Sequence, residues 1–158
     1  MEFHLAQVNI GKMLAPINNP IMAEFVANLD AINTLAEVSD GFIWRLRDDT
    51  NNATSIKFSD DDFLIINMSV WTSLETLFKF VYQSQHLEIF KKRQAWFEKM
   101  PLMHMALWYQ PVEQLPSVAE ATKRLDYLRT NGETPFAFTF RHKFSATEAE
   151  IFTNSLEN

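Results

Sequence analysis

Hydrophobic residues follow two different periodicities along this chain, and these predict its strands and helices. Apolar residues that alternate with polar ones are typical of half-buried strands, whereas apolar residues recurring every three or four positions are typical of helices. The alternating pattern predicts strands over residues 3–10, 42–47, 63–71, 104–110 and 136–144. The helical pattern predicts helices over residues 20–38, 72–81, 84–100 and 117–129. Asp48 to Asp62 is polar and carries turn residues, so we expect a loop there.

Capping signals support the starts of several predicted helices. These signals are Asn19 before Pro20, Thr72 with Glu75, and Ser117 with Glu120. Ser39-Asp40-Gly41 and Asn131-Gly132 provide helix ends, and residues 82–85 are expected to break the helical pattern.

The order of these elements indicates the fold class. Strand-helix-strand-strand-helix-strand is the ferredoxin-like order, an α+β fold with an antiparallel four-stranded sheet and both helices on one face. A further helix and strand follow. We therefore expect one ferredoxin-like domain with a helix-strand extension over residues 1–144, and a frayed or loosely docked tail over residues 145–158.

The predicted strands have one nearly uniform apolar face and one mixed face. The apolar face, expected to lie under the helices, consists of Ala6, Val8, Ile10, Phe42, Trp44, Leu46, Leu64, Ile66, Met68, Val70, Met105, Leu107 and Tyr109. The mixed face consists of Gln7, Asn9, Ile43, Arg45, Ile65, Asn67, Ser69, Trp71, His104, Ala106 and Trp108. The mixed face is too polar for a dry core and unusually aromatic for a wet surface, so we expect a pocket floor or a dimer interface. The alternative is a solvent-facing surface with incidental aromatic residues.

One helical stripe carries polar groups toward the interior. At roughly 100° per residue, His86, Phe90, Arg93 and Phe97 fall on the same face of the predicted helix over residues 84–100. Because burying an imidazole and a guanidinium costs free energy unless they are paired, this stripe must have polar partners.

Composition narrows the class of protein. The chain has 158 residues, 47% of them hydrophobic, so it is long enough for a sizeable core. A net charge of −6 disfavours a nucleic-acid-binding surface, and the absence of cysteine excludes thiolate metal sites and a cysteine nucleophile. No segment approaches the about 20 uninterrupted apolar residues of a membrane span, and the N-terminus does not resemble a signal peptide. We therefore expect a cytoplasmic protein with no nucleic-acid or membrane partner.

Three polar residues on predicted helices are candidates for chemistry. His86 is a candidate general base, and the alternative is a structural hydrogen bond at the start of the helix. Arg93 is a candidate ligand for a carboxylate or an enolate, although pairing with a core acid, Asp30 or Glu37, is the favoured interpretation. Asn33 is either a ligand-binding amide or a satisfied core amide.

Further candidates come from the mixed sheet face. Trp71 and Trp108 are expected to stack on an aromatic ligand. The candidate polar groups there are Asn9, Arg45, Asn67 and His104. No metal site is expected, because His86 and His104 are not at a metal-ligand spacing and no acidic residue accompanies them.

Several motifs resemble a known superfamily. These motifs are Trp71-Thr72-Ser73-Leu74-Glu75 with Ser84-Gln85-His86, Gly41-Phe42-Ile43-Trp44-Arg45-Leu46, Arg93 with Trp96-Phe97, Met105-Ala106-Leu107-Trp108, and Pro135 with Ala137-Phe138-Thr139-Phe140. The first resembles the dimeric α/β-barrel superfamily of antibiotic-biosynthesis-monooxygenase-like proteins. The others resemble one bacterial family of domain-of-unknown-function type that is usually placed in that superfamily.

The resemblance implies a homodimer whose two sheets close face to face into a dimeric α/β barrel around a cavity. It also implies three alternative functions. The first is a monooxygenase-like enzyme that acts without a cofactor on an aromatic or polyketide-like substrate, with His86 as base and Arg45 or Arg93 with Asn67 stabilising an oxyanion. The second is a non-catalytic ligand-binding or stress-related dimer. The third is a protein that binds haem through His86.

Overall fold

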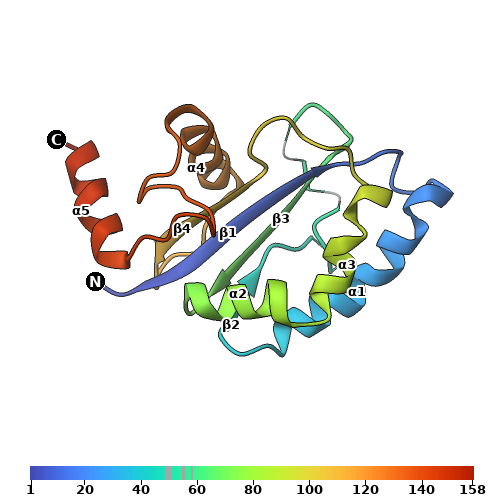
Figure 1. Ribbon diagram of the computed structural model, residues 1–158, viewed down its shortest axis with the longest axis horizontal. Coiled ribbons are helices and arrows are strands. Elements are labelled where there is room, and N and C mark those ends of the chain that lie inside the picture. Colours follow the sequence, from blue (N-terminus) through green and yellow to red (C-terminus); the bar gives the residue numbers. More distant parts are fainter. Residues whose placement is uncertain (49–50, 55, 58) are drawn as a thin grey trace.

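The chain folds into one antiparallel sheet with helices on both of its sides (Figure 1). The computed structural model describes residues 1–48, 51–54, 56, 57 and 59–158. Its strands are β1 (Phe3–Lys12), β2 (Phe42–Arg45), β3 (Leu64–Trp71) and β4 (Met105–Pro111). Its helices are α1 (Ala23–Glu37), α2 (Leu74–Gln83), α3 (His86–Lys91), α4 (Val118–Asn131) and α5 (Ala146–Leu156), with short 3₁₀ helices η1 (Pro20–Met22) and η2 (Arg93–Ala95). The predicted loop over residues 48–62 includes residues 49, 50, 55 and 58, which lie outside the described residues.

The sheet has the strand order β2-β3-β1-β4, and every neighbouring pair is antiparallel. This is the ferredoxin-like order, so the predicted α+β class and sheet are confirmed. In the central pair, Gln7 lies opposite Ser69 and Asn9 lies opposite Asn67. Paired residues in an antiparallel sheet share a face, so these polar side chains form one continuous patch.

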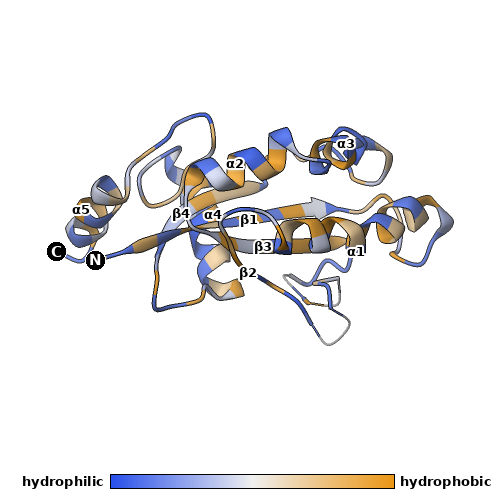
Figure 2. Ribbon diagram, turned by 90° about the horizontal axis from the view of Figure 1, so that it is seen from below, coloured by the Kyte–Doolittle hydropathy of each residue, from blue (hydrophilic) through white to orange (hydrophobic). Residues whose placement is uncertain are grey.

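The two ferredoxin-like helices cover the mixed face of the sheet, which corrects the predicted arrangement. Leu74, Leu77 and Phe80 of α2 and Ala36 of α1 form a core cluster with sheet residues that include Trp71. Figure 2 places α2 and α3 on one side of the sheet and α4 on the other. The expectation that α1 and α2 cover the uniformly apolar face is therefore wrong. That face is apolar because α4, part of the extension after the fourth strand, packs on it.

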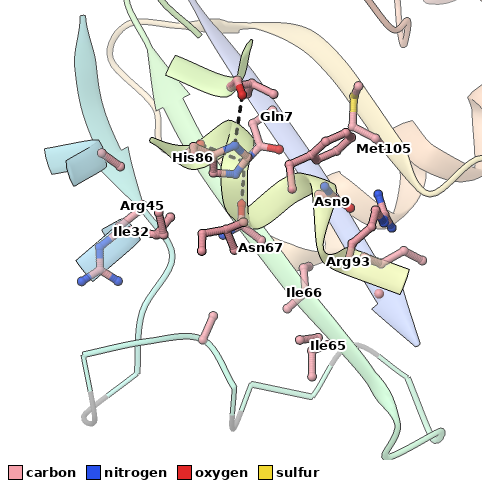
Figure 3. A pocket seen from close by; sticks show the side chains of 18 of the residues that line it. Gln7, Asn9, Ile32, Arg45, Ile65, Ile66, Asn67, His86, Arg93 and Met105 are labelled. Carbon is pink, nitrogen blue, oxygen red and sulfur yellow. Dashed lines mark hydrogen bonds between the residues drawn. The ribbon is translucent and has the colours of Figure 1, made fainter. Parts of the chain in front are cut away.

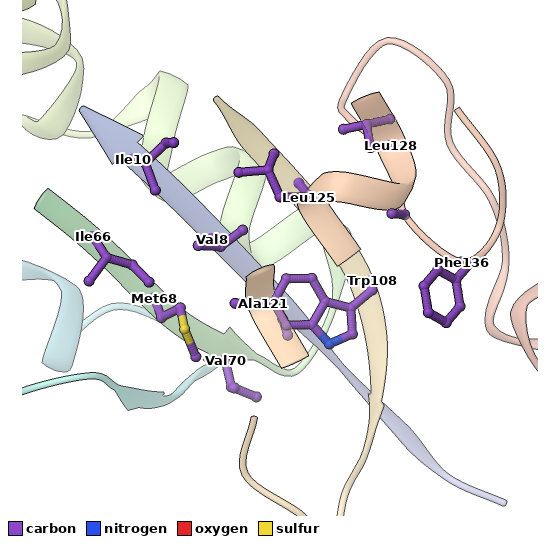
Figure 4. Packing of buried hydrophobic residues seen from close by; sticks show 13 residues of the cluster. Val8, Ile10, Ile66, Met68, Val70, Trp108, Ala121, Leu125, Leu128 and Phe136 are labelled. Atoms are coloured by element: carbon purple, nitrogen blue, oxygen red, sulfur yellow. The ribbon is translucent and has the colours of Figure 1, made fainter. Parts of the chain in front are cut away.

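The core under α4 is formed by the apolar sheet face and the inward side of that helix. Ala121, Leu125 and Leu128 of α4 pack on residues from three strands, as Figure 4 shows. The sheet residues of this cluster are Ala6, Val8, Ile10, Ile66, Met68, Val70, Ala106 and Trp108, all at most 3% exposed. Because this face is already buried within one chain, it is not free to form the cavity that the resemblance implied.

The phase of β4 also differs from the prediction. Trp108 pairs with Ala6 and Ala106 pairs with Val8, so both belong to the α4 side. Consequently Met105 and Leu107 lie on the mixed face with Gln7. The alternation in this strand was misleading because both of its faces are buried: Leu107 and Trp108 are each 0% exposed.

The helix predicted over residues 84–100 is shorter than expected. It forms α3 and the 3₁₀ helix η2, and Phe97 then makes an isolated bridge to Met13. The predicted break over residues 82–85 is confirmed, because α2 ends at Gln83 and α3 begins at His86. The cap of α2 lies one residue later than predicted, since Ser73 and Thr76 form the capping box.

The predicted strand over residues 136–144 is reduced to isolated bridges. Ala137 forms a bridge with Thr134, and Phe138 exchanges two backbone hydrogen bonds with Leu107 (2.7 and 3.0 Å). The Glu133 carboxylate accepts hydrogen bonds from the backbone N–H and the hydroxyl of Thr139. These bonds hold the segment in a turn and compete with a strand ladder.

The residues after 144 form helix α5 where a frayed or loosely docked tail was expected. Ser145 and Glu148 form a reciprocal capping box, Ala149 is buried, and Phe152 packs at the edge of the α4 core. The expectation failed because it weighed polarity and overlooked the Ser-x-x-Glu signal. The division into a domain and a tail stays a prediction.

Candidate functional site

A cavity of about 440 Å³ lies between the mixed face of the sheet and helices α1 to α3. Its floor comes from β1 and β3, and its walls come from α1, α2, α3 and the residues around η2 (Figure 3). Asn67 remains exposed although it lies on an internal strand, which shows that the helices do not close over the floor. The mixed face therefore forms the floor of a cavity, but this cavity is built within one chain and lies under the helices.

Most of the predicted site residues line this cavity. Those that line it are Asn9, Asn33, Arg45, Asn67, Trp71, His86, Arg93 and His104. Trp108 does not, because it lies in the core under α4, where its Nε1 donates to Gln110 Oε1 (2.9 Å). The placement of Trp108 on the mixed face, from which its role in stacking on a ligand was predicted, is therefore wrong, since it rested on the mistaken phase of β4.

The polar stripe on residues 84–100 faces the cavity as the helical spacing predicted. His86, Phe90, Arg93 and Phe97 all line it, although regular α-helix ends at Lys91. The sheet floor and this stripe therefore face each other. His86, the first residue of α3, and Arg93, the first residue of η2, both line the cavity, because α3 and η2 lie over the mixed face and not on the far side of the sheet as predicted.

The tautomer of His86 follows from its hydrogen bond. Nδ1 lies 3.3 Å from the carbonyl oxygen of Val81. A carbonyl oxygen can only accept, so Nδ1 carries the proton and Nε2 of the neutral ring has a free lone pair. Burial lowers the pKa of His86, and the bond to Val81 partly offsets this shift. The Phe80 and Phe90 rings lie 5.0 and 6.3 Å from the imidazole, centroid to centroid, and supply the apolar surroundings.

A hydrogen-bond chain orients the amides of the floor. Trp71 Nε1 donates to Ser69 Oγ (2.8 Å), and Gln7 Nε2 donates to both Ser69 Oγ (2.8 Å) and Asn67 Oδ1 (2.7 Å). Because Asn67 accepts through its oxygen, its amide N–H groups are left to face the cavity. The floor therefore presents a hydrogen-bond donor from the exposed Asn67 side chain.

Arg45 is less suited to a catalytic role than predicted. Its Nε donates to Glu37 Oε1 (2.7 Å), and its Nη2 donates to Asn51 Oδ1 (3.0 Å). The Arg45 side chain is 6% exposed and Glu37 compensates its charge. This pair also corrects the expectation that Glu37 pairs with Arg93.

Arg93 has a neutral partner instead of an acid. Its Nη1 lies 3.1 Å from His104 Nε2. A guanidinium can only donate, so His104 accepts and is neutral. Burial lowers the pKa of His104, and the Arg93 charge lowers it further. Neither Asp30 nor any other carboxylate among the described residues forms an ion pair with Arg93.

Some cavity residues were not identified as candidates from the sequence. Gln7 and Ser69 were placed on the mixed face but not in the site, although the alternation that selected Asn67 applies equally to them. Thr139 and Arg141 also line the cavity. They come from the turn after α4, and no local signal in the sequence connects that turn with the helices across the sheet.

Among the residues that the structure describes, no group of three or more histidine, aspartate or glutamate side chains is arranged to hold a metal ion. In the same part of the chain, no helix is both long and apolar enough to cross a lipid bilayer.

The fold and the cavity define an α+β protein with a ferredoxin-like sheet and an internal pocket under its helices. The chain belongs to the family described as domain of unknown function DUF3291, whose model matches residues 4–154. The predicted membership of such a family is confirmed, and the wider monooxygenase-like superfamily stays a prediction.

Comparison with curated proteins finds no match. Among solved structures, the crystal structure of PA3566 from Pseudomonas aeruginosa is similar, at 13% sequence identity and a TM-score of 0.47. The match covers 73% of this chain and 98% of PA3566.

Proposed function

We propose that this protein is a small-molecule enzyme that takes a proton from an aromatic or polyketide-like substrate in the cavity, without a bound cofactor. The observation that carries the proposal is His86, whose Nδ1 is held by the Val81 carbonyl. Its Nε2 has no partner among the described residues. A neutral imidazole with a free nitrogen in an apolar cavity is suited to act as a general base.

The floor supplies the second element of this chemistry. Proton removal from a phenol or an activated CH₂ group leaves negative charge on a substrate oxygen. The Asn67 amide, oriented by Gln7, is a fixed donor for such an oxygen. Donors that are already fixed in place stabilise developing charge without having to reorganise during the reaction. Arg45, held by Glu37, has only an indirect part in this scheme.

In the monooxygenase-like reaction, His86 takes the proton and the resulting carbanion adds to dioxygen, the co-reactant. The O–O bond of the peroxide then breaks. One oxygen stays on the carbon as a carbonyl. The other leaves as water, which contains the proton returned by His86 and the remaining proton of that carbon. The CH₂ group is oxidised while dioxygen is reduced, so no further reductant is required.

The test is oxygen uptake with a panel of phenols, quinols and polycyclic ketones that carry an activated CH₂ group. His86→Gln is expected to lower kcat by about 100-fold or more, the usual range for loss of a general base. His142→Gln is the matched control, because His142 is exposed and does not line the cavity. Turnover that survives His86→Gln contradicts the proposal, and binding without turnover favours the non-catalytic ligand-binding alternative.

The homodimer and the haem alternative have separate tests. We expect sedimentation to give a dimer, with each chain carrying its own cavity, so that the number of bound ligands follows the number of chains. A Soret band on adding haem that disappears in His86→Gln would favour haem binding through this residue instead.

A further inference from the structure

The Arg93 end of the cavity carries positive charge that no acid among the described residues compensates. Arg93 donates to a neutral histidine, and Arg129 lies close enough to His104 to lower its pKa further. None of the carboxylates in the described ranges pairs with Arg93, whereas Arg45 and Arg124 each have a glutamate partner. Burying an unpaired guanidinium is costly, so an arginine that is half-buried beside a cavity favours an anion there.

Neighbouring residues suit this end to a planar anion. The guanidinium carbon of Arg93 lies 5.6 Å from the centre of the Phe90 ring, which restricts its orientation. Asn9 lies on β1, next to the segment that carries His104. It pairs with Met105, and the N–H of the following residue, Ile10, donates to the His104 carbonyl (2.8 Å). The Asn9 side chain lines the cavity, and no partner for its amide is found among the described residues. Figure 3 draws Asn9 and Arg93 at the same end of the pocket.

We propose that Arg93, with Asn9 beside it, binds the carboxylate of an aromatic acid whose body lies along Phe90. The substrate class is thereby narrowed to aryl carboxylic acids with an acidic group at the end remote from the carboxylate. The carboxylate subsite is inferred from the contacts of Arg93 alone. The position of the acidic group at His86 rests in addition on the proposed function.

The spacing of the three residues sets the length of the ligand. His86, Phe90 and Arg93 lie at positions i, i+4 and i+7, and both polar groups are close to the Phe90 ring. The five steps from His86 to Lys91 in α3 rise about 7.5 Å, and Arg93 lies beyond them in η2. An elongated molecule with the carboxylate and the acidic oxygen at opposite ends fits this spacing better than a compact one.

The test compares para-coumarate, which has a phenol and a carboxylate at opposite ends, with its neutral amide, para-coumaramide. Isothermal titration calorimetry is expected to give para-coumarate an affinity at least about tenfold higher, because a charge-assisted hydrogen bond is stronger than a neutral one. Arg93→Gln is expected to abolish this preference while leaving the affinity for para-coumaramide unchanged. Arg93→Lys keeps the charge without the planar fork and is expected to retain part of the preference.

Lys91→Gln is the matched control, since Lys91 is an exposed cation at the end of α3, two residues before Arg93, and does not line the cavity. It should keep the full preference for the carboxylate. Thermal unfolding of each variant establishes that it is folded before binding is measured. An equal preference in wild type and folded Arg93→Gln overturns the proposal, and so does the failure of wild type to bind either compound.

The two proposals fail in distinguishable ways. If Arg93→Gln loses the preference but His86→Gln changes no turnover, the carboxylate subsite stands and the general base is wrong. If turnover depends on His86 while carboxylate and amide bind alike, the subsite is wrong and the enzyme proposal stands.

Discussion

Replacing Trp108 with alanine tests whether this indole belongs to the core under α4 or to a ligand site. Trp108 is 0% exposed, packs with α4, and donates from Nε1 to Gln110 Oε1 (2.9 Å). Removing a buried tryptophan side chain costs about 3–5 kcal/mol, and a buried acceptor left without its donor costs about 1–3 kcal/mol. The two terms overlap, so we expect a loss of about 4–5 kcal/mol. At about 2–4 °C per kcal/mol for a chain of this size, Tm should fall by about 8–20 °C.

The assay is urea unfolding followed by tryptophan fluorescence and circular dichroism, together with calorimetric scans for Tm. Trp108→Phe is the folded control, because it keeps most of the apolar volume and loses the hydrogen bond, at about 1–3 kcal/mol. It should bind para-coumarate like wild type. A loss below about 1 kcal/mol in Trp108→Ala, or weakened binding in Trp108→Phe, would refute the assignment of this face to the core.

Two further predictions concern titration and backbone conformation. Stability to urea should fall as the pH drops below 6.5, the ordinary pKa of histidine, because burial lowers the pKa values of His86 and His104 in the folded state. Below pH 6.5 the unfolded chain binds more protons than the folded chain, so the stability present above that pH is lost as the pH falls through the folded-state pKa values. His86→Gln should make this pH dependence less steep. An unchanged slope would contradict the burial of His86. Gly132→Ala should lower the free energy of unfolding by about 1–2 kcal/mol, because Gly132 has a positive φ of 75° that a side chain disfavours. In urea unfolding, Gly41→Ala should lower the free energy of unfolding by about 1–3 kcal/mol more than Gly132→Ala does, because the new Cβ at position 41 would lie 2.5 Å from Thr76 Cβ. Equal losses in the two variants would argue against this close packing.

The parts of the fold that depend on local spacing could be predicted from the sequence. The stripe of His86, Phe90 and Arg93 follows from helix geometry over a few residues, so its common orientation survives even though the regular helix is short. The amides Asn9 and Asn67 could likewise be placed on one face, because strand alternation is a local property.

The parts that depend on non-local packing could not be predicted. Whether a sheet face lies under α2 or α4 depends on where later segments of the chain dock, and α4 packs on strands far from it in sequence. In β4, Leu107 and Trp108 are both fully buried, so hydrophobicity does not distinguish its faces. The pairing of Arg45 with Glu37 also became visible only from the fold, as did the absence of an acid beside Arg93 in the part of the chain that the structure describes.

A crystal structure of the protein with para-coumarate would show directly whether the cavity under α3 binds an aromatic acid between His86 and Arg93. We expect ligand density between α3 and the floor formed by β1 and β3, with the carboxylate at Arg93 and the phenol oxygen within hydrogen-bond distance of His86 Nε2. Density on the α4 side of the sheet, or para-coumarate bound with neither end at these two residues, would contradict this expectation.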